Sequence, residues 1–134
     1  MSTFDSFRIA GSGLYANRKW MDAVSDNITN INTATSTDQT AFQERMIVVE
    51  AADYGSGQGG VRVAGAEFGS AEGRLVHEPD NPLADADGYV RYPDIDLGDQ
   101  MTQLIMAQRS YQANLASIER ATDAYQAALQ LGKG

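Results

Sequence analysis

A stripe of apolar side chains at the C-terminal end of the chain constrains its fold more than any other feature. The stripe continues for about thirty residues at alternating spacings of four and three, which is the repeat of a helix that meets another helix along one face. Apolar residues scattered at random would drift off a single face over that length. The stripe positions are Leu97, Met101, Leu104, Gln108, Tyr111, Leu115, Ile118, Thr122, Tyr125 and Leu129.

The flanking residues predict where this helix begins and ends. Pro93 lies before it, Asp96 and Asp99 place negative charge at the positive end of the helix dipole, and Gly132 is positioned to stop it. A helix over residues 96–131 is about 54 Å long at about 1.5 Å per residue. Because the rest of the chain is too small to cover such a helix, we expect part of it to be buried against other molecules.

A second stripe with the same spacing predicts a helix over residues 7–31. Gly11 and Gly13 weaken its first turns by roughly 1 kcal/mol each relative to alanine. We expect residues 1–32 to pack against residues 94–134 as a coiled-coil-like pair. The residues predicted to form the packing and assembly seam are Leu14, Met21, Val24, Ile28, Ile31, Leu97, Met101, Leu104, Tyr111, Leu115, Ile118, Tyr125 and Leu129.

The middle of the chain, residues 33–93, is predicted to hold a linker and a small β-rich insertion. Residues 33–40 are rich in Ser and Thr without periodicity, which is typical of a loop or linker. Short β-prone runs follow, separated by glycines that suit hairpin turns. The predicted strands are 42–50, 61–68, 74–77 and 89–92. The sequence therefore predicts an α+β fold, with long terminal helices and a small antiparallel β insertion between them.

The net charge is negative and lies mainly in the middle of the chain. Eighteen acids and ten bases give −8, of which 0 falls on residues 1–33, −6 on residues 34–93 and −2 on residues 94–134. Without a basic stripe, we expect no binding to nucleic acid or to an anionic membrane surface. The sequence has no cysteine, no apolar run long enough for a membrane span and no secretory signal at its start. Export, if it occurs, is expected to use a route without a cleaved signal peptide.

Three patterns suggest bound ligands, and their context argues against each. Residues 55–60 match G-x-G-x-x-G and residues 11–16 match its alanine variant, but a dinucleotide site needs a strand, then a helix, then a suitably placed acid. Residues 83–94 resemble a calcium loop, yet Leu83 stands where the first carboxylate belongs. His77 is the only histidine, so no two-histidine metal site can form. We expect no cofactor, metal, small-molecule substrate or catalytic residue, and thus no enzyme.

Several segments carry motifs of a known protein family. Residues 25–33 have the pattern Ser-x-Asn-Ile-x-Asn-x-Asn-Thr, and residues 7–16, 77–82, 85–90 and 109–114 also match. On these segments the chain resembles the flagellar basal-body rod proteins, and among them the short C-type subunit of the proximal rod. The resemblance covers nearly the whole chain. It departs from the family pattern at Asp38-Gln39-Thr40-Ala41-Phe42, where the family usually has a glycine after the acid and a tyrosine.

The resemblance implies a structural subunit that polymerises helically through its terminal helices and transmits torque from the motor to the hook. It also implies export through the flagellar type III apparatus, without a cleaved signal peptide, to the periplasmic rod of the basal body. The implied partners are copies of the chain, other flagellar rod proteins, and the membrane-ring and export-gate adaptor proteins. A small soluble helical hairpin that binds or regulates another molecule would show the same stripes, and it stays open as the alternative.

Overall fold

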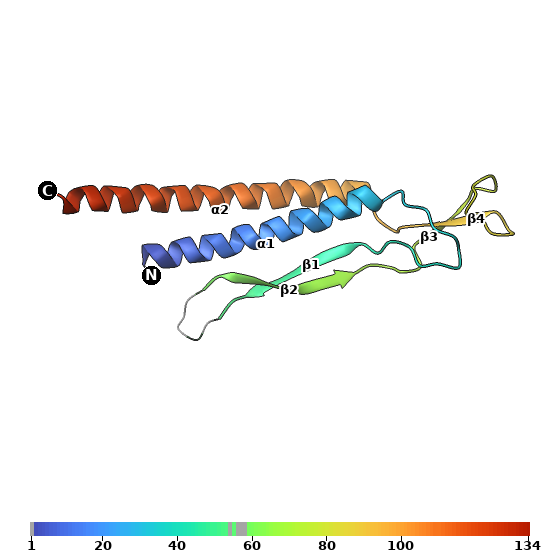
Figure 1. The fold of residues 1–134 in the computed structure, drawn as a ribbon, viewed down its shortest axis with the longest axis horizontal. Helices are drawn as coiled ribbons and strands as arrows, with labels where there is room; N and C mark the ends of the chain where they lie inside the picture. Colours follow the sequence, from blue (N-terminus) through green and yellow to red (C-terminus); the bar gives the residue numbers. More distant parts are fainter. Residues whose placement is uncertain (1, 54, 56–58) are drawn as a thin grey trace.

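The computed structural model is an elongated molecule in which two long helices lie side by side (Figure 1). It describes residues 2–53, 55 and 59–134, so part of the glycine-rich segment 55–60 lies outside the described residues. The predicted α+β fold, with terminal helices around a small antiparallel strand region, is confirmed. The elements in order are α1 (Thr3–Asn30), β1 (Arg45–Ala51), β2 (Val61–Phe68), β3 (Arg74–His77), β4 (Tyr89–Tyr92) and α2 (Leu97–Gly132).

Helix α1 begins earlier than its apolar stripe predicts because a capping box fixes its first turn. The Ser2 hydroxyl accepts the Asp5 backbone N–H at 3.2 Å, and the Asp5 carboxylate accepts the Ser2 N–H at 2.9 Å. Gly11 and Gly13 lie within the continuous helix. The helix ends where the Asn30 amide donates to a carbonyl of the preceding turn at 2.9 Å.

Helix α2 begins directly after Asp96, whose carboxylate accepts the Asp99 N–H at 2.8 Å. It has 36 residues against 28 in α1, and it includes Gly132, which was expected to stop it. Near the start of α1 the ring of Phe4 meets the ring of Tyr125 edge-on at 6.0 Å. The turns of α2 beyond this contact extend past the N-terminus of α1 (Figure 1). We call residues 126–132 the C-terminal overhang.

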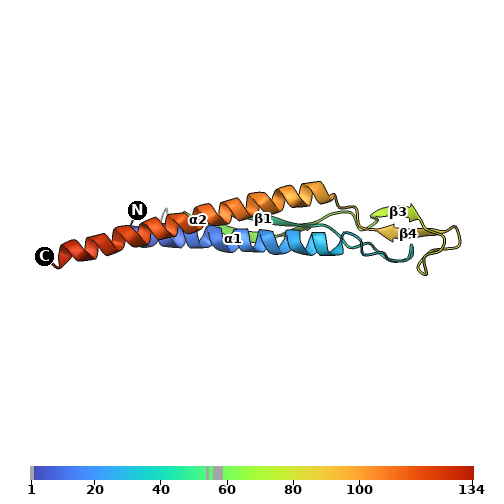
Figure 2. The same cartoon turned by 90° about the horizontal axis from the view of Figure 1, so that it is seen from above.

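The strands form two separate antiparallel pairs, β1 with β2 and β3 with β4. Helix α1 lies between α2 and the β1–β2 hairpin, whereas β3 and β4 lie beyond the ends of the helices (Figures 1 and 2). The strand predicted to begin at residue 42 begins at Arg45. Just before β1, the Gln43 side chain donates a hydrogen bond to the Gly69 carbonyl at 2.8 Å. The carbonyl that follows β2 is therefore paired with a side chain and not with the backbone of a longer β1.

The connection between β3 and β4 is organised by the carboxylate of Asp85. One oxygen accepts the N–H groups of Asp87 and Tyr89 at 3.0 and 2.9 Å, and the other accepts the Thr37 hydroxyl at 3.0 Å. These hydrogen bonds, above all the one from the Tyr89 backbone, lower the pKa of Asp85. Gly88 comes directly after Asp87 and has a φ of 84°, a conformation that glycine adopts without strain in a turn.

Acid should loosen this connection through Asp85. Because folding lowers the pKa of Asp85, its stabilising effect is present above the ordinary value of 3.8 and is lost as the pH falls through the lowered value of the folded state. We expect the amide resonances of Asp87 and Tyr89 to shift in that range during an NMR titration. Asp85→Asn should abolish the transition, whereas Asp80→Asn in the same connection should leave it in place.

Gly73 has the least room for a side chain among the described glycines. Its φ is 59°, and an added Cβ would lie 2.1 Å from the carbonyl oxygen of Tyr92. Gly73→Ala should therefore lower the free energy of unfolding by about 2 kcal/mol or more. Gly11→Ala is the matched control, because its Cβ would meet nothing within 4 Å and alanine stabilises a helix by up to about 1 kcal/mol. Urea unfolding of both variants distinguishes the two effects, and a neutral Gly73→Ala would contradict the close approach.

Candidate assembly interface

Three polar side chains join α1, β1 and α2 in one hydrogen-bond network. The Asn27 side chain donates to the Arg45 carbonyl at 3.0 Å and accepts the Arg45 N–H at 2.9 Å, so it pairs with β1 much as a neighbouring strand would. Its amide also donates to Gln100 Oε1 at 2.9 Å, and Gln100 Nε2 donates to Glu44 Oε1 at 2.6 Å. Asn27 and Gln100 are each only 1% exposed. We call Asn27, Gln100 and Glu44 the amide clamp.

The rest of the contact between α1 and α2 is built largely from small and polar residues. Trp20 Nε1 donates to Gln103 Oε1 at 3.2 Å, and Ala107 is completely buried. Gly13 gives room for Asn114, because a Cβ on Gly13 would lie 2.7 Å from the Asn114 amide. Hydrogen bonds and close approach define how the two helices lie against each other, as single polar residues do in coiled coils.

The large apolar side chains of α2 lie mainly outside this contact. The buried residues of α2 are Gln100 and Ala107, whereas Ile105 is 47% exposed and Leu131 is 84% exposed. So many large apolar side chains exposed on one helix are typical of a surface that another molecule covers. Tyr125 contacts Phe4 of α1, and we call the other exposed residues the outer apolar surface; it comprises Leu97, Met101, Ile105, Met106, Leu115, Leu129 and Leu131.

The residues predicted for the seam fall into groups of different exposure. Val24 is buried, and the half-buried residues are Leu14, Met21, Ile28, Ile31, Leu104, Tyr111 and Ile118. The exposed residues are Leu97, Met101, Leu115, Tyr125 and Leu129. Within the chain, the α2 face toward α1 includes Gln100, Ala107 and Asn114, which precede stripe positions by one residue. One residue rotates a helix face by about 100°, so Met101 and Leu115 point to the side of the contact with α1.

Known proteins match both helical ends of the chain. The family model described as "Flagella basal body rod protein" matches residues 7–34, and that described as "Flagellar basal body rod FlgEFG protein C-terminal" matches residues 86–131. The chain is 37% identical over 134 residues to the flagellar basal-body rod protein FlgC of Salmonella typhimurium (strain LT2), covering 99% of this chain and 100% of that protein. The chain belongs to the FlgC family of flagellar basal-body rod proteins.

Other relatives of this rod protein are similar over the same extent. FlgC of Yersinia enterocolitica is 39% identical over 134 residues, with 99% of this chain and 100% of the relative covered. FlgC of Aquifex aeolicus (strain VF5) is 34% identical over 134 residues, with 99% of each covered. The resemblance to the C-type rod subunit is thereby confirmed.

The two matched segments of this rod protein contain the two helical partners of the amide clamp. Asn27 lies in the segment 7–34 and Gln100 lies in the segment 86–131. No helix in the described part of the chain has an apolar stretch long enough to cross a bilayer. Among the same residues, no three His, Asp or Glu side chains come together as a possible metal site.

The amide clamp of this rod protein was not singled out by sequence analysis. Asn27 belongs to the signature at residues 25–33, but there it served only to identify the family. Gln100 lies between two apolar stripe positions, where a polar residue is normally expected to face solvent. Neither Asn27 nor Gln100 belongs to the apolar stripes, so the apolar periodicity gives no signal for their contact.

Replacing Asn27 should weaken the whole rod protein. Asn27→Ala leaves the Arg45 backbone groups and the buried Gln100 Oε1 without their partner, and we expect a loss of about 2–4 kcal/mol in the free energy of unfolding. Asn30→Ala is the matched control, because the Asn30 side chain bonds only to groups near it in the sequence, the Asp26 carbonyl and the Thr33 hydroxyl, and its loss should cost less than about 1 kcal/mol. Urea unfolding followed by circular dichroism measures both. If Asn27→Ala and Asn30→Ala lowered the free energy of unfolding equally, the amide clamp would not be what holds the helices and β1 together.

Proposed function

We propose that this chain is a structural subunit of the flagellar basal-body rod and that it joins other subunits through the outer apolar surface of α2. The exposure of that surface carries the proposal. Burial of apolar area stabilises an interface by about 25 cal/mol per Å², so covering these side chains with neighbouring subunits is strongly favoured. The similarity to flagellar basal-body rod proteins supports the same role.

The proposed partners are copies of this chain and other rod proteins, with membrane-ring and export-gate adaptor proteins at the base. We place the subunit in the periplasmic part of the rod, which it would reach through the flagellar export apparatus without cleavage of a signal peptide. There it would act by transmitting torque and would catalyse no reaction. Long helices packed at native density suit that task, because protein interiors compress little.

A soluble helical hairpin is the alternative with the same sequence stripes. Such a module is expected to bury its apolar stripe within the chain. The exposure of Leu115 and Leu129 instead favours contacts between molecules. Assembly therefore accounts for these residues better than a closed hairpin does.

A charge on the outer apolar surface should block assembly without unfolding the chain. Leu115 is 39% exposed, so Leu115→Asp should change the free energy of unfolding by less than about 1 kcal/mol. In a neighbour-covered interface the same carboxylate would be buried without a partner, which costs several kcal/mol. We expect loss of motility and absence of the chain from isolated basal bodies.

The matched control for Leu115→Asp is Ser117→Asp. Ser117 is also exposed, and two residues further along the helix it points to a different side. Normal motility of cells that carry Leu115→Asp would show that Leu115 does not lie in the interface. Equal defects in the two variants would show that any added charge on α2 is harmful, and not specifically one on the apolar surface.

A further inference from the structure

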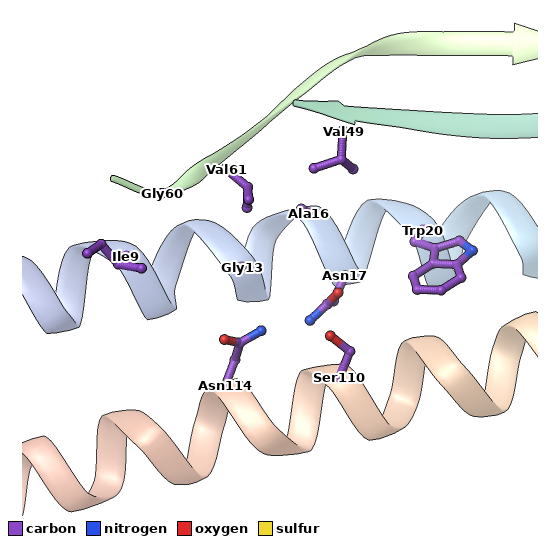
Figure 3. A pocket seen from close by; sticks show the side chains of 10 residues that line it. All are labelled: Ile9, Gly13, Ala16, Asn17, Trp20, Val49, Gly60, Val61, Ser110 and Asn114. Atoms are coloured by element: carbon purple, nitrogen blue, oxygen red, sulfur yellow. The ribbon is translucent and has the colours of Figure 1, made fainter. Parts of the chain in front are cut away.

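A groove of about 360 Å³ runs along α1, with α2 on one side and the β1–β2 hairpin on the other (Figure 3). Its apolar side includes Ile9 of α1 with Val49 and Val61 of the hairpin. Asn17 of α1 faces Ser110 and Asn114 of α2 on its polar side (Figure 3). The described residues that line this groove carry no charge. The groove thus suits an uncharged occupant that is apolar on one part and polar on another.

One buried donor in the groove lacks an acceptor within the described chain. Asn17 is 8% exposed, and its Nδ2 makes no hydrogen bond to the described residues. A buried amide donor without an acceptor destabilises a protein by about 1–3 kcal/mol. Because its Nδ2 is buried, the Asn17 side chain must turn toward the groove for an occupant's oxygen acceptor to remove that penalty. The groove is therefore distinguished from a merely apolar depression.

The C-terminal overhang has the matching chemistry. Its residues 126–132 are uncharged and exposed. Gln126, Leu129 and Gln130 are spaced i, i+3 and i+4, so they share one face of the helix. That face presents one apolar side chain between two carboxamides. Leu129 fits the apolar side of the groove, and a glutamine oxygen fits the Asn17 amide.

We infer that the C-terminal overhang of one copy seats in the α1 groove of a second copy. The overhang cannot fill the groove of its own chain, because at about 1.5 Å per residue Leu129 lies about 22 Å along α2 from Asn114. Each copy therefore offers an overhang and receives one. Such a head-to-tail contact repeats without closing unless the rotation between copies closes a ring, so it suits a helical assembly. This inference rests on the proposed function and names one contact within it.

Disulfide trapping tests this contact in the assembled rod. The chain has no cysteine, so only introduced thiols can react. The test variant carries Val49→Cys in the groove and Leu129→Cys in the overhang, both at exposed positions. Oxidation of isolated basal bodies should yield dimers and higher multiples of the chain, with the bond between residues 49 and 129 identified by mass spectrometry.

The matched control carries Leu83→Cys with Leu129→Cys, because Leu83 is equally exposed but lies in the connection between β3 and β4. We expect at least about a tenfold lower yield from it, since disulfides form only between Cα atoms within about 7 Å. Adding Asn17→Ala to the test variant should lower its yield about fivefold, the effect of one lost hydrogen bond. If the variants do not form rods, the disulfide yields of the test and control variants are compared in the purified full-length protein. The yield of the test variant must then exceed that of the control and rise with protein concentration.

Equal yields from the test and control variants would overturn the inference, as would a disulfide to a different protein at position 49. Normal rods that contain the chain without the 49–129 bond would overturn this contact while leaving the proposed function intact. Absence of the unmodified chain from basal bodies would overturn both.

Discussion

The hydrogen bonds of Asn27 hold the rest of the structure in place. Its single carboxamide satisfies both backbone groups of Arg45 and one end of Gln100, while Gln100 reaches Glu44 with its other end. Buried amides add little net stability when paired, yet they are costly when unpaired. A slide of either helix along the other would break several of these bonds at once. The network therefore fixes the relative positions of α1, β1 and α2 more than it stabilises them.

The fully buried residues of the two helices are mostly small or polar. Polar and small residues lie between α1 and α2, whereas Met101, Ile105 and Leu115 are exposed on the outside. Apolar area left exposed in one molecule becomes a driving force for contact with the next. The polar contacts inside the chain give its shape, and the apolar contacts outside are available for assembly. A subunit of this kind gains much of its stability only when its neighbours are present.

Most of the secondary structure could be predicted from local patterns. Strands β2, β3 and β4 have their predicted bounds, and both helices lie where the 3-4 stripes indicated. The differences arise from side-chain hydrogen bonds that a pattern does not register, such as the capping box of Ser2 and Asp5 before the stripe begins. The candidate interface was less predictable. The length of α2 predicted that part of it lies against other molecules, but a helical stripe looks the same whether its partner is in the same chain or in another molecule, so the particular exposed residues, such as Leu97, could not be predicted.

The sequence by itself determined the helical stripes, the strand-forming runs, the acidic middle and the family, because these depend on spacing and composition along the chain. The tertiary structure alone decided which face of α2 turns toward α1, that Asn27 and Gln100 meet, and that a groove forms around Asn17. These features join residues far apart in the sequence. Their pairing depends on the three-dimensional position of each side chain, on which neither apolar periodicity nor residue type carries information.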